Sequence, residues 1–472
     1  NAMNGVVNII TRRAADSRGL LAHAEAGTRD KDFALRYGGG PSESAYRLYA
    51  KWSDRGSTEL PGRVDAGDDW TLFQAGFRTD LDRGADAFTL QGDYQQGAQN
   101  FLAISDDVAF RGANLLGRWV RTGERVDTRL QVYFDRVDRS KPPEGIAFDI
   151  DTWDIELQQS TELAGRHQLV WGLGRRSYDY QTQNNVLAFV PSHRDLRVTN
   201  LFVQDGITLG GGFKLTAGVK LEENIYSGWE TLPDLRLSWA PGDTMLLWLA
   251  GSRAVRAPTP FDTDVQEFVE STLFLQGTPQ FQPEQVTAFE IGIRGNPVAR
   301  FSYSASVFYD EYDDLRTVEI TPVTLLPLRW GNLMKGSAHG VEAWANVQVA
   351  PWWRLSPGFR SVHKDLEFEE GSSQLAGLAQ AGNDAHSAWQ LKSSMDFGEF
   401  TLDALLRHVG ELPEPQSDAY SDLSARFAWR LNDQVEIAIK GFNLLNETHR
   451  EYADPQGREI RRSVLAEIRY IR

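Results

Sequence analysis

The sequence has no cysteine among its 472 residues and only 8 histidines. The absence of cysteine excludes disulfide frameworks, Cys-ligated zinc, iron–sulfur clusters and thiol nucleophiles. No hydrophobic run approaches the roughly 18 to 20 apolar residues that a membrane-spanning helix requires, which excludes a helical membrane protein. A membrane β-barrel is compatible with this composition, because its strands alternate between two faces and average out as polar.

Positive charge is also scarce. The chain has 49 Lys and Arg against 65 Asp and Glu, a net charge of −16, and its calculated pI is 5.1. This balance repels phosphate backbones, so we expect no nucleic-acid partner. The length fits either about three ordinary domains or one large one.

Apolar and polar residues alternate with a period of two in stretches of about nine to fourteen residues, longer than the five or six usual for globular strands. Residues 45–52 and 87–95 show the pattern clearly. It predicts one lipid-facing and one lumen-facing side in each strand. We expect lipid contact from Tyr46, Leu48, Phe88, Leu90, Trp153, Ile155, Val464 and Ile468, and a lumen position for Arg47, Lys51, Gln91, Asp93, Glu156, Glu467 and Arg469.

The connections between these stretches alternate between short and long. Ten short turns rich in Gly, Asn, Asp or Pro are expected at 39–44, 82–86, 122–125, 164–166, 210–212, 241–243, 296–299, 350–352, 398–399 and 432–433. Eleven longer polar connections are expected near Thr28, at 54–69, 98–112, 138–150 and 183–193, near Ser227, and at 253–283, 315–331, 365–385, 410–418 and 446–460. These 21 connections join 22 strands. The pattern predicts an all-β fold, a 22-stranded antiparallel transmembrane β-barrel with Arg253–Pro283 as its longest outer loop.

A soluble all-β array such as a propeller is the alternative. Its strands are short and its blades repeat at about 40 to 50 residues, and this sequence shows no such repeat. Several tryptophans also fall near the short turns, where an aromatic girdle of a barrel lies: Trp239, Trp248, Trp344, Trp352, Trp353 and Trp429.

Six phrases, in the same order along the chain, resemble the TonB-dependent receptors of Gram-negative outer membranes. They are N-G-V-V-N-I-I-T at 4–11, N-L-F-V-Q-D at 200–205, S-R-A-V-R-A-P-T at 252–259, the P-E to E-I-G-I-R stretch at 283–294, the N to G-V-E stretch at 332–342, and G-F-N-L-L-N at 441–446. The resemblance implies that residues 1–18 are the remnant of a plug domain that is otherwise missing, and that residues 19–472 form the transmembrane barrel. It also implies a monomer in outer-membrane lipid.

The function that this resemblance implies is energised import of a ferric siderophore or another bulky metal chelate, with the TonB complex contacting a missing N-terminal region. No catalytic residues, cofactor or metal site are expected. A haem receptor is disfavoured, because residues 259–283 contain no His between the R-A-P phrase and the position of an N-P-x-L phrase.

Aromatic and cationic residues of the long loops and upper lumen are the candidates for ligand capture, because siderophores are often aromatic and anionic. The set is Tyr178, Tyr180, Trp229, Phe261, Phe268, Phe274, Arg329 and Trp330. The alternative for each is a membrane-interface anchor or a loop-packing residue. The acidic residues Asp262, Asp264, Glu267 and Glu270 fit a solvated loop better than a calcium site, which needs six to eight oxygen ligands.

Three other classes stay open. A passive porin shares the strands but has no use for the plug-like opening phrase. An outer-membrane enzyme needs a Ser, His and acid group on one rim, and the two Ser–His neighbours, at 192–193 and 386–387, have no clear partner. A soluble carbohydrate-binding β protein differs in that it needs no detergent.

Overall fold

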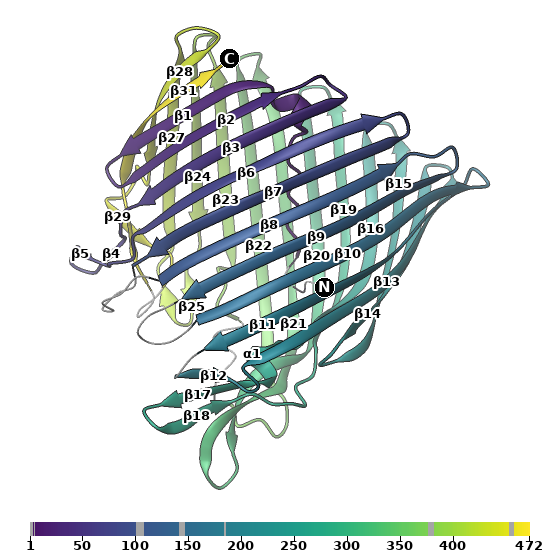
Figure 1. Ribbon diagram of the computed structural model, residues 1–472, viewed down its shortest axis with the longest axis vertical. Helices are drawn as coiled ribbons and strands as arrows, with labels where there is room; N and C mark the ends of the chain where they lie inside the picture. Colours follow the sequence, from purple (N-terminus) through teal and green to yellow (C-terminus); the bar gives the residue numbers. More distant parts are fainter. Residues whose placement is uncertain are drawn as a thin grey trace.

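The computed structural model describes residues 3, 5–100, 108–140, 147–183, 186–375, 382–452 and 457–472. A single antiparallel wall dominates these residues (Figure 1). Among them, no helix is long and apolar enough to cross a membrane.

The wall has 22 strands and closes on itself, because the first strand pairs with the last. Its first half contains β1 (Gly19–Gly27), β2 (Asp30–Gly39), β3 (Ser44–Arg55), β6 (Trp70–Arg83), β7 (Asp86–Gln99), β8 (Val108–Arg121), β9 (Val126–Ser140), β10 (Ala147–Leu163), β11 (His167–Gln183), β13 (His193–Gly210) and β14 (Phe213–Asn224). Its second half contains β15 (Gly228–Gly242), β16 (Met245–Arg256), β19 (Glu284–Val298), β20 (Phe301–Thr321), β21 (Leu325–Ala350), β22 (Trp353–Phe368), β23 (Ser387–Asp396), β24 (Phe400–Val409), β27 (Tyr420–Arg430), β28 (Val435–Phe442) and β31 (Ser463–Ile471). The predicted fold class is therefore confirmed.

Smaller helices and strands lie at the two openings of the barrel. They are the 3-10 helix η1 (Ala14–Ser17), the helix α1 (Pro260–Thr263), and the short strands β4 (Glu59–Leu60), β5 (Val64–Asp65), β12 (Leu187–Phe189), β17 (Val265–Val269), β18 (Thr272–Gln276), β25 (Leu412–Pro413), β26 (Gln416–Ser417), β29 (Thr448–Arg450) and β30 (Glu459–Arg461). Apart from η1, they all belong to connections at the same rim, which we call the long-loop rim.

All ten predicted short turns join consecutive wall strands at the opposite rim, the short-turn rim. Three of the eleven predicted long connections are not long loops in the structure. The connections near Thr28 and Ser227 are themselves short, between Gly27 and Asp30 and between Asn224 and Gly228. Residues 315–331 are mostly strand, because β20 and β21 continue their ladder beyond the wall as a hairpin.

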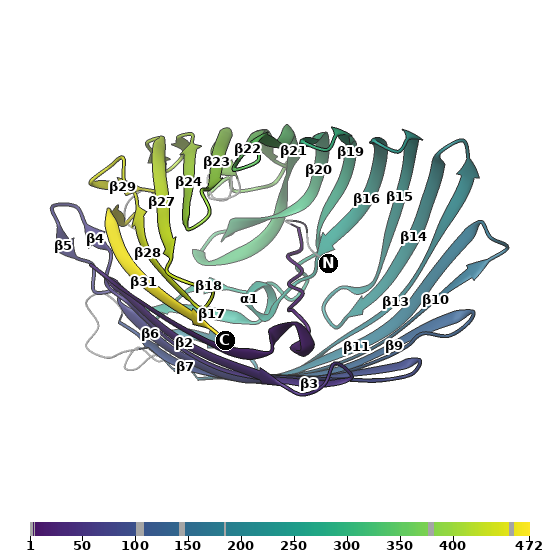
Figure 2. The same cartoon turned by 90° about the horizontal axis from the view of Figure 1, so that it is seen from above.

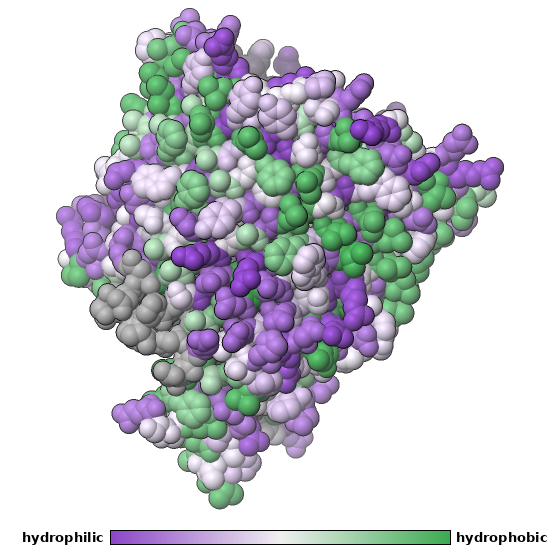
Figure 3. Space-filling model, in the orientation of Figure 1, coloured by the Kyte–Doolittle hydropathy of each residue, from purple (hydrophilic) through white to green (hydrophobic). Residues whose placement is uncertain are grey.

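The two faces of the wall follow the predicted register. The eight residues expected to face lipid are all exposed, with 40% to 56% of their surface accessible. The expected lumen residue Glu467 is only 7% exposed and binds Lys440 and Arg426. Figure 3 shows apolar side chains spread over the outer surface of the wall, with polar ones in its lower middle part and along its upper and right edges. One polar and one apolar face is what a barrel in a membrane needs.

Residues 5–18 run inside the barrel and end against its wall (Figure 2). The backbone N–H of Ala14 donates to Asp80 of β6 at 2.7 Å, and Arg13 forms an ion pair with Asp82 at 2.5 Å. Ala14 and Ser17 are buried against the wall. The segment is therefore bound to the lumen face of β3 and β6 at the short-turn rim.

Candidate ligand-binding site

The connection between β16 and β19, residues 257–283, folds into an ordered cap that we call the lid. Its helix α1 begins after Thr259, whose backbone and side chain both bond to Asp262, and Pro260 occupies the first turn, where a missing N–H costs nothing. The hairpin β17–β18 follows and turns at Glu270, which has a positive φ of 56°. In Figure 1 the lid lies at the long-loop rim, and in Figure 2 it projects inside the outline of the barrel.

Backbone pairing ties the lid to both sides of the rim. Strand β12, in the connection after β11, pairs with β17, and β18 pairs in parallel with the extended part of β21. The hydroxyl of Thr278 donates to the carbonyl of Trp330 at 2.6 Å. The lid is therefore part of the sheet network and not a solvated loop.

A fully buried carboxylate, Asp262, holds the lid to the wall. It receives the guanidinium of Arg256 at 2.9 Å and that of Arg316 at 3.1 Å, and its own exposure is 0%. Burial alone raises the pKa of such a carboxyl, but the Arg256 and Thr259 hydrogen bonds outweigh it, so the pKa of Asp262 lies below its usual 3.8. The carboxylate is therefore charged throughout the physiological range.

A second acidic residue, Asp264, anchors the next turn of the lid. It accepts the hydroxyl of Tyr226 at 2.7 Å and pairs with Arg194 at 3.1 Å, and Tyr180 lies 3.4 Å away. Burial and the hydrogen bond to Asp264 raise the pKa of Tyr226. The expectation of a solvated acidic loop is wrong for Asp262 and Asp264, because each carboxylate is buried against cations from the wall; Glu270 stays exposed.

Aromatic rings gather at the same place. Phe261 of α1 packs against Trp330 with ring centroids 5.4 Å apart. The guanidinium of Arg316 lies 4.6 Å from the Trp330 ring centre and 5.9 Å from that of Phe261. The indole N–H of Trp330 is buried and has no hydrogen-bond partner. A cation and an unpaired donor thus lie side by side, an arrangement that suits an anionic or carbonyl-bearing ligand.

A cavity of about 930 Å³ opens beside this cluster. Its wall combines aromatic, cationic and acidic side chains from β16 and β19–β22. Its lining includes Arg256, Glu284, Phe308, Asp310, Tyr312, Arg316, Trp330, Glu342, Arg360, Lys364 and Asp384. Among the described residues, Arg360 makes no ion pair, whereas Lys364 pairs with Asp384. The volume lies in the range of small-molecule pockets.

The structure brings some of the eight predicted ligand residues together. Phe261 and Trp330 are in contact, Trp330 lines the cavity, and Tyr180 is 5% exposed beneath the lid. Tyr178 lies two residues before Tyr180 on β11, and its hydroxyl accepts a hydrogen bond from Arg176.

The other predicted residues lie apart from the cavity. Phe268 and Phe274 belong to the β17–β18 hairpin, and Arg329 is exposed on the strand that pairs with it. Trp229 is 59% exposed at the start of β15, on the outward face that it shares with Leu235. That position matches the alternative of a membrane-interface anchor.

Arg316, Asp262, Arg256 and Glu284 were not among the predicted ligand residues, although they build the site. Arg256 belongs to the R-A-P phrase and Glu284 to the P-E phrase, so the motifs pointed at these two positions without revealing their role. Nothing in the local sequence indicates that Arg316 reaches Asp262, 54 residues away.

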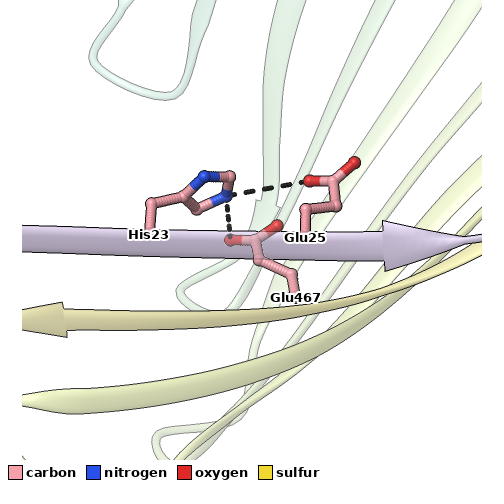
Figure 4. A group of neighbouring side chains, drawn as sticks. All are labelled: His23, Glu25 and Glu467. Atoms are coloured by element: carbon pink, nitrogen blue, oxygen red, sulfur yellow. Dashed lines mark ion pairs between the residues drawn. The ribbon is translucent and has the colours of Figure 1, made fainter. Parts of the chain in front are cut away.

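His23, Glu25 and Glu467 bring ligand atoms within 4.8 Å of one another at the seam where β1 meets β31 (Figure 4). The Lys440 ammonium lies 2.6 Å from Glu25 and 2.5 Å from Glu467. Because Lys440 binds both carboxylates and Arg426 also binds Glu467, the group is an ion-pair network that joins the first strand to the last strands.

We compared the chain with known protein families and structures. The sequence profile described as TonB dependent receptor-like, beta-barrel matches residues 17–444. No curated protein sequence matches the chain.

Several solved structures share the fold at low sequence identity. The siderophore receptor PirA from Acinetobacter baumannii is 12% identical, with 98% of this chain and 81% of that chain aligned at a TM-score of 0.82. A variant of the ferric enterobactin receptor PfeA from Pseudomonas aeruginosa, in complex with enterobactin, is 14% identical, with 99% and 83% aligned at 0.80. The copper transporter OprC is 13% identical, with 96% and 80% aligned at 0.75.

Proposed function

Because the chain belongs to the family of TonB-dependent receptor β-barrels, we propose that it works in energised import across the Gram-negative outer membrane. We also propose the division of the chain into residues 1–18, a plug segment, and residues 19–472, the barrel. The TonB complex is the energy-coupling partner that this family implies, and transport does not call for catalytic residues.

The substrate class we propose is a ferric siderophore or a similar bulky, anionic metal chelate. The observation that carries this proposal is the cavity of about 930 Å³ beside the lid, whose lining includes Arg316, Arg360 and Trp330 with its unpaired indole N–H. Guanidinium groups and aromatic faces bind the anionic edges and flat rings of such chelates. Receptors with the same fold bind siderophores, which supports this choice, although the copper transporter shares the fold as well.

A passive porin-like channel is the second candidate, because it would use the same wall. The lid argues against it: a pore that conducts freely has little use for a cap held by two buried carboxylates.

Ligand binding tests the substrate class directly. The purified chain in detergent is titrated with a ferric tricatecholate complex, and binding is followed by tryptophan fluorescence. We expect saturable binding, and Arg360→Ala weakens it about tenfold, because a contact between a cation and an anionic ligand is lost. Arg354→Ala is the matched control, and it should leave binding unchanged. Arg354 lies on the same face of the same strand, six residues nearer the short-turn rim and so roughly 20 Å from Arg360.

Transport is tested in cells that express the gene encoding this chain, with and without TonB. Uptake of the radiolabelled iron complex that depends on TonB supports import, and uptake that persists without TonB favours the porin. Equal binding by both arginine variants would contradict the cavity as the binding site, whatever the transport result.

A further inference from the structure

Three histidines lie together on the outer surface of the barrel, away from the lumen cavity. His339 of β21 and His363 of β22 are directly opposite each other across the ladder, with ring centroids 5.3 Å apart. His386, one residue before β23, has its ring centroid 5.6 Å from that of His363. Three of the chain's 8 histidines therefore lie in a row across β21, β22 and the start of β23, although 47 residues separate the first from the last.

The register places His339 and His363 on the outward face, and the ring contact with His363 places the His386 ring beside them. On β20 the residues Phe308, Asp310 and Tyr312 line the lumen cavity, so the alternate residues Val307 and Tyr309 point outward, and both are largely exposed. Tyr309 is the ladder partner of His339, which places His339 on the same face. All three histidines are exposed. The cluster is therefore open to solvent and separate from the proposed import path.

The spacing of the rings suits one shared metal ion. Zinc binds imidazole nitrogen at about 2.0 to 2.1 Å in tetrahedral geometry, which puts the ring centres of two such ligands about 5 Å apart. The two neighbouring pairs, with ring centroids 5.3 and 5.6 Å apart, agree with this value. His363 is the central ring, flanked by the other two, so an ion bound by all three would lie over His363, with the exposed outer rings rotated toward it.

The surroundings favour a cation and orient the central ring. The Nε2 atom of His363 lies 3.3 Å from a carboxylate oxygen of Asp365, a pairing that commonly orients metal-binding histidines. A shallow groove of about 680 Å³ beside the cluster carries Glu311, Asp313, Asp365 and Glu367 against two lysines, Lys335 and Lys364. This surplus of acidic groups attracts cations and repels phosphates.

The histidines lie close enough to the long-loop rim to contact water. Two to four residues nearer the short-turn rim, the outward positions are apolar, with Val341 on β21 and Phe359 on β22. Two residues toward the long-loop rim they are polar, with Ser337 and Asp365. The histidines thus lie at the upper border of the apolar band, where a dissolved ion can enter.

We propose that His339, His363 and His386 form a surface site for a divalent transition-metal ion of the zinc and copper class, on the outer face of the barrel at the long-loop rim. Imidazole is the nitrogen ligand that these ions prefer, and Asp365 completes or orients the set.

Calorimetric titration of the purified chain with Zn²⁺, in detergent and without chelating buffer, tests the site. We expect one ion per chain, and His363→Ala weakens binding by about tenfold or more. His339→Ala and His386→Ala each weaken it as well. These side chains are exposed, so the variants keep the barrel fold, which heat-modifiable migration in gel electrophoresis verifies.

Two further variants separate this site from other histidines. His167→Ala removes an exposed histidine that pairs with Asp205 near the short-turn rim, and it leaves Zn²⁺ binding unchanged. His23→Gln removes the histidine of the seam network and also leaves binding unchanged. Loss of binding in His23→Gln, retention of it in His363→Ala, or no stoichiometric binding by the unaltered chain would each overturn the proposal.

Electron paramagnetic resonance of the Cu²⁺-loaded chain gives an independent readout. Nitrogen hyperfine structure from more than one imidazole is expected, and it is reduced in His363→Ala. A spectrum with oxygen ligands alone would count against the site.

Discussion

The two rims of the barrel are built by different means. At the short-turn rim, local bonds close each turn: the side chain of Asn432 accepts the backbone N–H groups of Gln434 and Val435, two and three residues away. At the long-loop rim, the lid is held by Arg316 bound to Asp262 and by Thr278 bound to Trp330, contacts that span 54 and 52 residues.

The two rims are thus stabilised differently, one by local turn chemistry and the other by contacts between distant segments. A short turn loses little chain entropy on closing, so turn chemistry alone is enough to form it. The lid has to offset the ordering of 27 residues, and it does so with buried ion pairs and strand pairing to distant segments. The short-turn rim is therefore robust to single changes, and the lid depends on a few residues.

The largest effect on the free energy of unfolding is expected in the wall between the two rims. Leu90 faces outward on β7, four residues from the short turn, and Leu90→Arg should destabilise the barrel by about 2 to 4 kcal/mol, because a charge near the bilayer midplane is costly. Gln91→Arg, one residue along and facing the lumen, should cost much less. Denaturant unfolding in lipid vesicles measures both, and equal costs would refute the assigned register.

Removing the buried anchor of the lid is the sharpest test of the long-loop rim. Asp262→Ala leaves Arg256 and Arg316 without their shared carboxylate. We expect the free energy of opening the lid to fall by about 2 to 3 kcal/mol. The loss is smaller than for a fully buried ion pair, because Arg316 keeps 38% of its side chain exposed. Hydrogen exchange of residues 257–283 should rise while that of the wall stays constant.

The matched control is Glu270→Ala, which removes an exposed acidic residue from the same lid. It should leave the hydrogen exchange of the lid unchanged. If Asp262→Ala behaves in the same way, the buried ion pairs do not hold the lid.

A change at the short-turn rim should be smaller and local. Asn432→Ala removes two side-chain hydrogen bonds from one turn, and we expect a loss of about 0.5 to 1.5 kcal/mol that faster hydrogen exchange at residues 431–435 reports. Asp433→Ala, at the neighbouring exposed position, is the control. An effect that spreads to the lid would break the contrast between the rims.

The smallest effect is expected from pH. The folded-state pKa of Asp262 lies below its usual 3.8, so its contribution to stability is complete above that value and is lost only as the pH falls through the folded pKa. The lid should therefore stay closed from pH 8 to about 4 and open only at a pH below 3.8. Fluorine NMR of fluorotryptophan-labelled chain, with the Trp330 signal assigned through Trp330→Phe, follows the transition, and an opening near pH 6 would contradict it.

Much of the architecture was predictable from the sequence. The period-2 alternation predicted the exposed face of β3, β7, β10 and β31, and turn residues such as Gly398 and Asn432 marked all ten short turns. The predictions failed near Thr28 and Ser227, where polar residues that resemble a loop form a tight turn, and at 315–331, where the strands continue beyond the wall. Polarity alone does not distinguish a loop from a strand surrounded by water on both faces.

The candidate site was predictable only in part. Aromatic residues in the long connections pointed to Phe261, Trp330 and Tyr180, because their residue types carry the chemistry of ligand capture. Arg316 was missed, and Asp262 and Asp264 were assigned to solvent, since burial depends on which distant strand lies opposite them.

The sequence by itself determined the strand register, the short turns and the family of this protein, since each rests on residues close together in the chain or on short phrases. Only the tertiary structure decided that the lid projects into the barrel outline, that Asp262 meets Arg316 and that His339, His363 and His386 lie next to one another. The physical reason is that closing the sheet into a barrel sets the neighbours of each strand end, and the ion pairs and ring contacts at the long-loop rim form only between those neighbours.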